Sequence, residues 1–229
     1  MPKISPYISI VIPTLNEEDN IGQMLQGVKK VLDSHGYNYE LIVVDKYSRD
    51  NTVKIAREYG AKILFDGIGK GSALIKGIKS AKGSIIISMD ADLSHQPNEL
   101  LLLIAGIEAG YDVCMGSRFL TGGGSEDISL LRKIGNTFFV KLVNLIYHTH
   151  YTDMCYGYRS FDTKAVKKLK LAELGFGIET EINIESAKRH LKVLEVPSYE
   201  KQRGSGSGKL RTFRDGWVIL RTIIKKLHD

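Results

Sequence analysis

Short apolar runs alternate with amphipathic segments through the first half of the chain. A brief β-branched run bounded by turn-forming residues predicts a buried strand, and apolar residues spaced three or four apart predict a helix. Strands that alternate with helices indicate a mostly parallel sheet with helices on both faces. On this basis we expect strands at 7–12, 39–44, 61–65, 84–89 and 111–117, and helices at 16–35, 52–59, 74–81 and 98–109.

The second half of the chain has Gly-rich loops at 122–127 and 203–209 and longer helical patterns. A helix is expected at 130–148, where basic residues separate an apolar stripe. Such a stripe usually packs against the sheet, so we expect core packing there, with a membrane-surface role as the alternative. The stripe consists of Leu131, Ile134, Phe138, Leu142 and Leu145. Other helices are expected at 163–169, 179–190 and 213–224, the last also basic and amphipathic, and a short strand at 193–196.

The totals limit the class of protein without choosing its partner. A chain of 229 residues is long enough for one well-buried α/β domain. Its net charge of +6 favours anionic partners in general, including nucleotides, phospholipid surfaces and nucleic acid. The two cysteines, Cys114 and Cys155, lack the spacing of metal ligands, so a reducing compartment is expected. No apolar run is long enough to span a bilayer, and no signal-peptide pattern opens the chain, so membrane contact is expected to be peripheral.

Two carboxylates one residue apart, Asp90 and Asp92, follow the predicted strand at 84–89. Ligands bind at the carboxyl ends of the strands in open α/β sheets, and residues i and i+2 of an extended chain point to the same side. Paired hard oxygen ligands suit Mg²⁺ or Mn²⁺ that also holds phosphate oxygens. The alternative is an Asp-x-Asp that arises by chance and caps the following helix. The setting favours the metal site.

Further polar residues fall at the same edge of the predicted sheet. Asp45 ends the second strand, and the turn at 13–17 ends the first. A carboxylate near a bound phosphate must act through a cation or contact the neutral nucleoside, so we assign Asp45 to the nucleoside and the Asp90 and Asp92 pair to the metal. Lys70, in a Gly-rich loop without Walker spacing, is expected to close on the nucleotide.

A set of motifs in order resembles family-2 glycosyltransferases with the GT-A fold, in the branch of dolichol-phosphate mannosyltransferases and polyprenyl-phosphate glucosyltransferases. The motifs are PTLNEEDNIG, VVDKYSRDNT, GKGSALIKG, MDADLSHQP, GSRF, TDMCYGYRSF, GFGIETEI, EVPSYEKQRGSGSGKL and DGWVILRTI. Each is weak alone, but together they cover nearly the whole chain. The resemblance implies a single GT-A (Rossmann-like) α/β domain over 1–229, with a nucleotide-sugar half at 1–120 and an acceptor half at 121–229.

The resemblance also implies an activity, a metal and partners. The activity is inverting transfer of a hexose, mannose or glucose, from a GDP- or UDP-linked sugar to dolichyl or polyprenyl phosphate, with Mg²⁺ or Mn²⁺. The partners are a membrane surface at the cytoplasmic face and, as a further candidate, a separate membrane-anchoring protein, but not nucleic acid.

The same resemblance assigns roles to individual residues. The nucleoside site is expected to include Pro13, Thr14, Glu17 and Asp45. The metal and diphosphate fall to Asp90 and Asp92, and the phosphates to Arg118, Arg132, Arg203 and Lys209. We take Asp92 and Arg118 as the catalytic residues.

The chain departs from the family pattern at a few positions. Lys46 and Tyr47 replace the acidic residue and the glycine that the family commonly has in the motif after the second strand. Ser94 stands where some relatives carry a Gln that binds the metal. The nucleoside contacts at the first of these places, and the metal shell at the second, therefore need not follow the family.

The nature of the acceptor determines whether the enzyme needs a base. A phosphate monoester is already largely dianionic at pH 7, so it needs positive charge around it rather than a general base. An alcohol acceptor, the second hypothesis, requires a carboxylate base such as Asp153 or Glu179. Two further hypotheses stay open: a nucleotidyltransferase, which releases pyrophosphate, and a non-catalytic basic module that has no use for Asp90.

Overall fold

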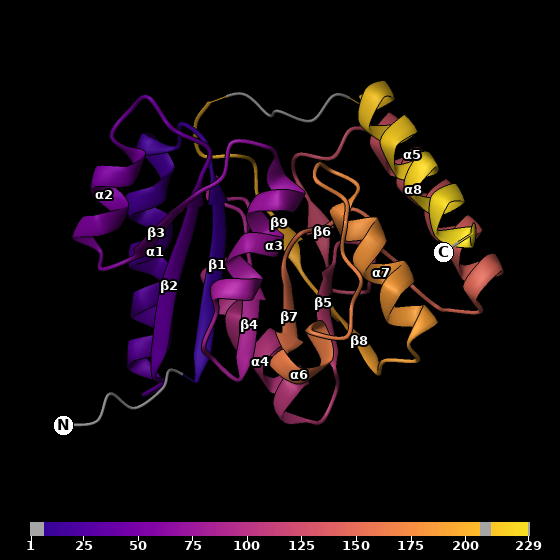
Figure 1. Ribbon diagram of the computed structural model, residues 1–229, viewed down its shortest axis with the longest axis horizontal. Helices are drawn as coiled ribbons and strands as arrows, with labels where there is room; N and C mark the ends of the chain where they lie inside the picture. The colour runs from indigo at the N-terminus through magenta and orange to yellow at the C-terminus, as the bar shows by residue number, and fades with distance from the viewer. Residues whose placement is uncertain (1–6, 207–211, 229) are drawn as a thin grey trace.

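A seven-stranded sheet runs through the middle of the molecule in the order β3-β2-β1-β4-β7-β5-β8 (Figure 1). The structure is a computed structural model that describes residues 7–206 and 212–228. A two-stranded pairing of β6 and β9 lies beside the main sheet. All pairings within the main sheet are parallel except those of β7. The predicted α/β class with a mostly parallel sheet is therefore confirmed.

The first half of the chain forms the elements that its apolar pattern predicts. Each predicted strand is present close to its expected bounds, because brief Ile- and Val-rich runs are stable only when both faces of the strand are covered. In chain order the elements are β1 (Ile8–Thr14), α1 (Glu18–Ser34), β2 (Tyr39–Asp45), α2 (Thr52–Glu58), β3 (Lys62–Phe65), α3 (Lys70–Ser80), β4 (Ile85–Ser88), the 3-10 helix η1 (Pro97–Glu99), α4 (Leu100–Glu108) and β5 (Val113–Ser117).

The second half adds a central strand that the sequence pattern does not predict. β7 lies antiparallel between β4 and β5. Its sequence, RSFD, has no apolar run. Arg159 is nevertheless buried in this strand, because its guanidinium donates hydrogen bonds to backbone and side-chain oxygens. The elements are β6 (Gly124–Ser125), α5 (Leu130–Tyr147), β7 (Arg159–Asp162), α6 (Thr163–Val166), α7 (Ile178–Lys188), β8 (Val193–Pro197), β9 (Tyr199–Glu200) and α8 (Thr212–His228).

Two apolar cores lie on opposite faces of the sheet. Side chains of β1 alternate between them: Ile8, Ile10 and Ile12 pack with α1 and α4, whereas Val11 packs with α3 and α7 (Figure 1). This alternation is the two-residue period of a strand covered on both sides. The sheet is therefore held rigidly between two helical layers, and the loops at its edge start from fixed positions.

The expectation that the apolar stripe of 130–148 packs on the sheet is wrong. Helix α5 lies beside α8 at the end of the molecule and contacts α7 and α8 (Figure 1). Four of the five stripe residues are exposed, and only Leu142 packs against a core. Helix α8 likewise buries Ile219 and Ile223 while Phe213 and Trp217 are 82% and 68% exposed. Each helix is thus apolar on two sides and buries one of them.

Among the described helices, none combines the length and the apolar character that a bilayer-spanning segment requires. The predicted division into two halves at residue 120 stays a prediction. Strand β7 of the second half lies in the same sheet as the strands of the first half.

Candidate active site

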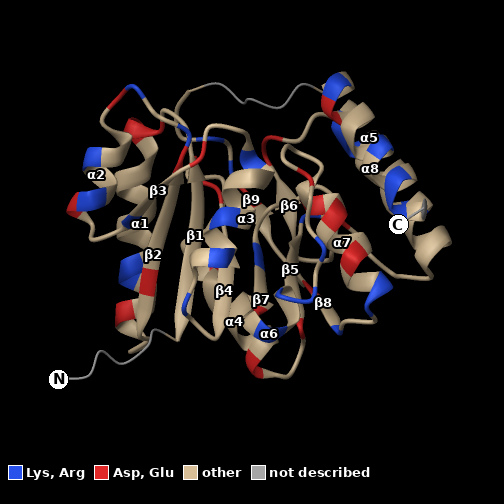
Figure 2. Ribbon diagram, viewed as in Figure 1, with Lys and Arg blue, Asp and Glu red and all other residues tan. Residues whose placement is uncertain are grey.

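The carboxyl ends of β1, β2 and β4 meet at one edge of the sheet. Thr14 and Asp45, the last residues of β1 and β2, are directly paired in the parallel register. The segment with Asp90 and Asp92 leaves β4, the other neighbour of β1, at the same edge. Figure 2 shows acidic and basic segments gathered at this upper edge. The sheet therefore brings together the polar residues that the sequence places after its strands.

Asp90 is held in a compact ion cluster. Lys70 Nζ lies 2.9 Å from Asp90 Oδ1 and 3.0 Å from Glu179 Oε1. Burial disfavours the charge of Lys70, but the two carboxylates outweigh it, so the pKa of Lys70 is raised. Burial likewise favours protonated Asp90, but the ammonium of Lys70 outweighs it, and the pKa of Asp90 is lowered. Both groups are therefore charged at neutral pH.

His95 fixes the backbone of the Asp90 segment. Its Nδ1 accepts the Asp90 amide at 3.0 Å, and its ring stacks on Tyr158 and meets the edge of Tyr156. Burial lowers the pKa of His95, so the ring is neutral at pH 7 and its Nδ1 lone pair is available to accept that bond. Sequence reasoning gave His95 no role, although it stands in the same motif as the two aspartates.

Asp92 is paired with an arginine from the far end of the chain. Arg203 NH1 lies 2.8 Å from Asp92 Oδ2, and its other terminal nitrogen contacts Glu17. The Gly204 amide donates to the Asp92 carbonyl, and Ser94 donates its hydroxyl to Asp92 Oδ1 at 2.6 Å. Three of the predicted site residues, which are Glu17, Asp92 and Arg203, thus meet in space.

Both oxygens of the Asp45 carboxylate accept hydrogen bonds from neighbouring residues. It is fully buried and accepts the Thr14 hydroxyl at 2.9 Å, together with the amide and the hydroxyl of Ser48. These bonds hold the 45–48 turn, in which Tyr47 adopts a left-handed φ of 56°. Tyr47 is exposed and stacks on Phe65 with ring centroids 5.3 Å apart. The departure from the family pattern at Tyr47 therefore creates an exposed aromatic face at the sheet edge.

Arg118 is neutralised by two carboxylates. Its Nε lies 2.7 Å from Asp153 Oδ2, its NH2 donates to Asp153 Oδ1 at 3.0 Å, and its NH1 lies 3.0 Å from Glu200 Oε2. The guanidinium also lies over the ring of Tyr156, 4.9 Å from the centroid. The catalytic role of Arg118 stays a prediction, and Asp153, the candidate base, is held in the same cluster.

The remaining predicted site residues are spread more widely. Pro13 lies within β1, next to Thr14. Arg132 is in the first turn of α5 and donates to Thr212 of α8 at 3.3 Å, so it belongs to the junction of those helices. Lys209 lies outside the described residues. Their roles in binding stay predictions.

The carboxylates fit a cation that is shared with a diphosphate. The described residues contain no group of three or more His, Cys, Asp or Glu side chains that could hold a metal alone. A nucleotide-bound Mg²⁺ needs only one or two protein carboxylates, however, and the side chains of Asp90 and Asp92 are 29% and 19% exposed. A Cβ atom on Gly157 would lie 3.2 Å from Lys70 Nζ and 3.5 Å from Asp90 Oδ2, so glycine there keeps space beside the cluster.

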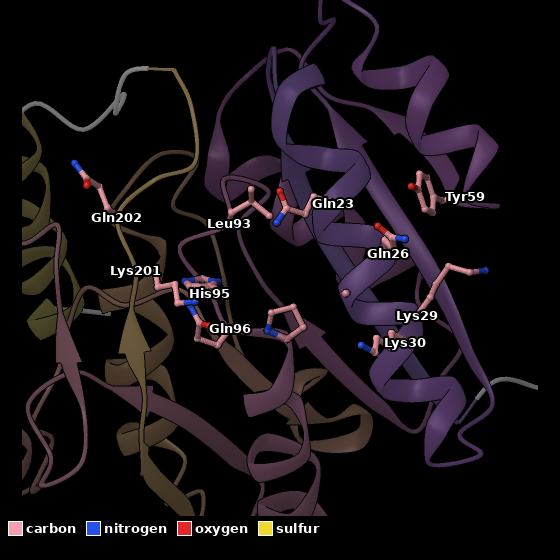
Figure 3. A pocket seen from close by; sticks show the side chains of 12 residues that line it. Gln23, Gln26, Lys29, Lys30, Tyr59, Leu93, His95, Gln96, Lys201 and Gln202 are labelled. Carbon is pink, nitrogen blue, oxygen red and sulfur yellow. The ribbon is translucent and has the colours of Figure 1, made fainter.

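A broad groove of about 750 Å³ lies behind the Asp90 segment, between α1 and the loop at 93–97 (Figure 3). Its wall includes His95, which also accepts the Asp90 amide, and the lysines Lys29, Lys30 and Lys201. None of the described residues that line it carries a carboxylate. The groove is therefore distinct from the edge where Asp90 and Asp92 meet their cations.

Sequence comparison places these motifs in a known family. The pattern of the family described as "Glycosyl transferase family 2" matches residues 9–170. The chain belongs to glycosyltransferase family 2. It is 34% identical over 212 residues to a dolichol-phosphate mannosyltransferase of Pyrococcus furiosus, covering 89% of this chain and 59% of that protein. It is 31% identical over 226 residues to a low-salt glycan biosynthesis hexosyltransferase of Haloferax volcanii, covering 96% and 54%. The chain thus spans little more than half the length of these two glycosyltransferases.

Comparison with solved structures confirms the GT-A fold of this chain. Glucosyl-3-phosphoglycerate synthase from Mycobacterium tuberculosis, solved with Mn²⁺, uridine diphosphate and glucosyl-3-phosphoglycerate, superposes with a TM-score of 0.76 at 20% identity. The superposition covers 96% of this chain and 80% of that one. A second structure of that enzyme, with Mn²⁺ and UDP-glucose, gives a TM-score of 0.78.

Proposed function

We propose that this protein transfers a hexose from a nucleotide sugar to a polyprenyl or dolichyl phosphate, with inversion and with the help of Mg²⁺ or Mn²⁺. One observation carries the proposal: Asp90 and Asp92 lie together at the sheet edge, each already paired with a cationic side chain from elsewhere in the chain. Such a site offers carboxylates to a metal and positive charges to phosphates. The Pyrococcus relative is a dolichol-phosphate mannosyltransferase by name, which supports the acceptor.

The donor side of the proposal rests on charge. A bound divalent cation would neutralise the diphosphate as it leaves the sugar. Asp90 and Asp92 would hold that cation, and Lys70 and Arg203 would then be released from their carboxylates to contact phosphate oxygens. The structural relative binds Mn²⁺ together with UDP or UDP-glucose, which supports a nucleotide-sugar donor of this kind.

The acceptor side rests on how the candidate bases are held. An alcohol acceptor needs a carboxylate able to take a proton. Asp153 accepts two hydrogen bonds from the guanidinium of Arg118, and Glu179 is paired with Lys70 at 3.0 Å. Both carboxylates are thus engaged by cations, and these contacts restrict their motion. A phosphate acceptor avoids this requirement because it arrives as an anion.

The exposed faces of α5 and α8 support contact with a membrane surface. Phe138, Leu145, Phe213 and Trp217 are exposed apolar residues on these two helices, and basic residues stand among them (Figure 2). An amphipathic helix with aromatic and basic residues binds at the interface of an anionic bilayer. The proposal therefore places the protein peripherally, at the cytoplasmic face where lipid phosphates are accessible. A separate membrane-anchoring protein is the competing occupant of this face.

The test of the proposal uses one nucleotide sugar with two kinds of acceptor. The native chain and Glu179→Gln are assayed with polyprenyl phosphate and with a polyprenol that lacks the phosphate, in detergent with Mn²⁺. Transfer to the phosphate alone, with inverted anomeric configuration, is expected from the native chain. Transfer to the alcohol that disappears in Glu179→Gln would replace the proposal with the alcohol-acceptor hypothesis.

A further inference from the structure

Glu181 of α7 joins the C-terminal helix to the loop at 172–174. Its Oε1 lies 2.9 Å from Lys226 Nζ of α8, and its Oε2 accepts the amides of Ala172 and Glu173, each at 2.8 Å. The side chains are 0% exposed for Glu181 and 4% for Lys226. A buried carboxylate is stable only when its charge is compensated, so the grip of Glu181 on the loop depends on the ammonium of Lys226.

Lys226 also holds the chain that leads into this loop. Its Nζ lies 3.0 Å from Glu185 Oε1 and donates to the Lys170 carbonyl at 3.0 Å. Glu185 Oε2 accepts the Lys170 amide at 2.8 Å. One ammonium from α8 therefore binds two carboxylates of α7 and the backbone just before the 172–174 loop.

The backbone of the 172–174 loop packs directly against the first turn of α3. The Leu174 carbonyl accepts the Ser72 amide at 3.2 Å. A Cβ atom on Gly69 would clash with the Leu174 carbonyl oxygen, and one on Gly71 would clash with that of Glu173. The two backbones are therefore in direct contact, so a shift of the loop toward α3 must displace the first turn of α3.

Lys70 stands between these two glycines, at the start of α3. Its ammonium reaches both Asp90 at the sheet edge and Glu179. Glu179 lies on α7, two residues before Glu181. The contacts therefore run without a gap from Lys226, through Glu181 and the loop, to the residue that faces Asp90.

We propose that Lys226 is a positioning residue for the donor site, which acts through Glu181 and the 172–174 loop to fix Lys70 beside Asp90. The consequence for catalysis rests on the proposed function, but the mechanical link does not. A helix that lies next to the exposed apolar face of α5 thereby sets the geometry of the first turn of α3.

Four variants of the full chain test this link. Lys226→Gln removes the ammonium, Lys226→Arg keeps the charge, and Glu181→Gln weakens the same link from the other side. Lys225→Gln is the matched control, since Lys225 is the preceding residue of α8 and is exposed. Each variant is compared with the native chain for its melting temperature and for amide hydrogen exchange, without any ligand.

The exchange rates of single amides distinguish positioning from a general loss of stability. We expect the Ser72 amide to exchange at least about fivefold faster in Lys226→Gln, the lower end of couplings between distant sites. Glu181→Gln should do the same, Lys226→Arg should recover most of the protection, and Lys225→Gln should match the native chain. The Val43 amide in β2 should not change. Equal acceleration at Ser72 and Val43, or no change at Ser72, would overturn the proposal.

Donor kinetics then test the link from Lys226 to Lys70 separately from the proposed function. If the native chain is active, Lys226→Gln should raise the KM for the nucleotide sugar at least about fivefold, in the same direction as Lys70→Met, while Lys225→Gln should not. A change in exchange with no turnover in the native chain would uphold the link and refute the proposed function. Normal exchange in Lys226→Gln with an active native chain would refute the link and leave the proposed function standing.

Discussion

Arg118→Met is expected to destabilise the protein strongly, because it leaves buried carboxylates without their cation. The native guanidinium binds Asp153 through two nitrogens and Glu200 through the third. The side chains are 8% exposed for Arg118 and 0% for Asp153, so solvent screens this pair little. The substitution keeps an unbranched apolar stem but removes the guanidinium, so its main effect is the loss of the charge and of the hydrogen bonds that it makes.

The size of the effect follows from the burial of Asp153. Removing one partner of a buried ion pair costs about 3–5 kcal/mol, since the other charge stays buried and unpaired. Asp153 Oδ1 still accepts the Cys155 amide at 3.1 Å, and Glu200 is partly exposed and still accepts the Ser125 hydroxyl. These contacts place the expected loss near the lower end, at about 3 kcal/mol.

Urea unfolding at pH 7 measures this loss in the free energy of unfolding. The control is Arg57→Met, which removes an exposed arginine of α2 and should cost under about 0.5 kcal/mol. Adding Asp153→Asn to Arg118→Met removes the unpaired charge and should recover about 1–2 kcal/mol. A loss below about 1 kcal/mol, or a double variant that is no more stable than the single one, would show that the pair is not a buried structural unit.

Three further measurements test the raised pKa of Cys155, the lipid-facing side of α8 and the role of Lys70. Burial raises the pKa of Cys155 to about 12. At pH 8 the thiol is therefore protonated and should react with iodoacetamide far more slowly in the folded protein than in urea. Equal rates would contradict the raised pKa. Trp217→Ser should weaken co-sedimentation with anionic vesicles about tenfold, because it removes apolar area from the exposed side of α8. The control Leu102→Ser on α4 should have no effect on co-sedimentation. Equal effects of the two variants would mean that α8 does not face the lipid. Lys70→Met should raise the donor KM about tenfold, as expected for the loss of a charge-assisted bond to phosphate. Lys79→Met, at an exposed position of the same helix, should leave the donor KM unchanged. A higher KM in both variants would mean that the effect comes from α3 as a whole and not from Lys70.

The strands of the nucleotide half could be predicted from sequence because each is a short apolar run between turn residues. β7 could not, since the sequence Arg159 to Asp162 has one apolar side chain and its burial depends on partners far along the chain. Local pattern carries no record of such partners. The same reason explains α5: its stripe has helical spacing, but whether the stripe is covered depends on where α7 and α8 lie.

The candidate site shows the same limit. Asp45, Asp90 and Asp92 could be placed at one edge of the sheet from their positions after apolar runs. The pairing of Asp92 with Arg203 across 111 positions, and of Asp90 with Lys70, is a property of the fold and could not be derived from spacing. In the sequence Asp45 is a candidate for a nucleoside contact, whereas in the structure Thr14 and Ser48 already occupy its oxygens, so that role stays a prediction.

The most direct test of the proposed function is release of nucleoside diphosphate in the presence of Mn²⁺ and polyprenyl phosphate. A panel of GDP- and UDP-linked hexoses is assayed with the native chain, with Asp90→Ala, and with Asp127→Ala, which removes an exposed carboxylate that takes no part in the ion pairs of Asp90 and Asp92. We expect release from one donor that requires both the metal and the lipid phosphate, is lost in Asp90→Ala and is unchanged in Asp127→Ala. Release that persists in Asp90→Ala, or that yields pyrophosphate instead, would contradict the proposed function.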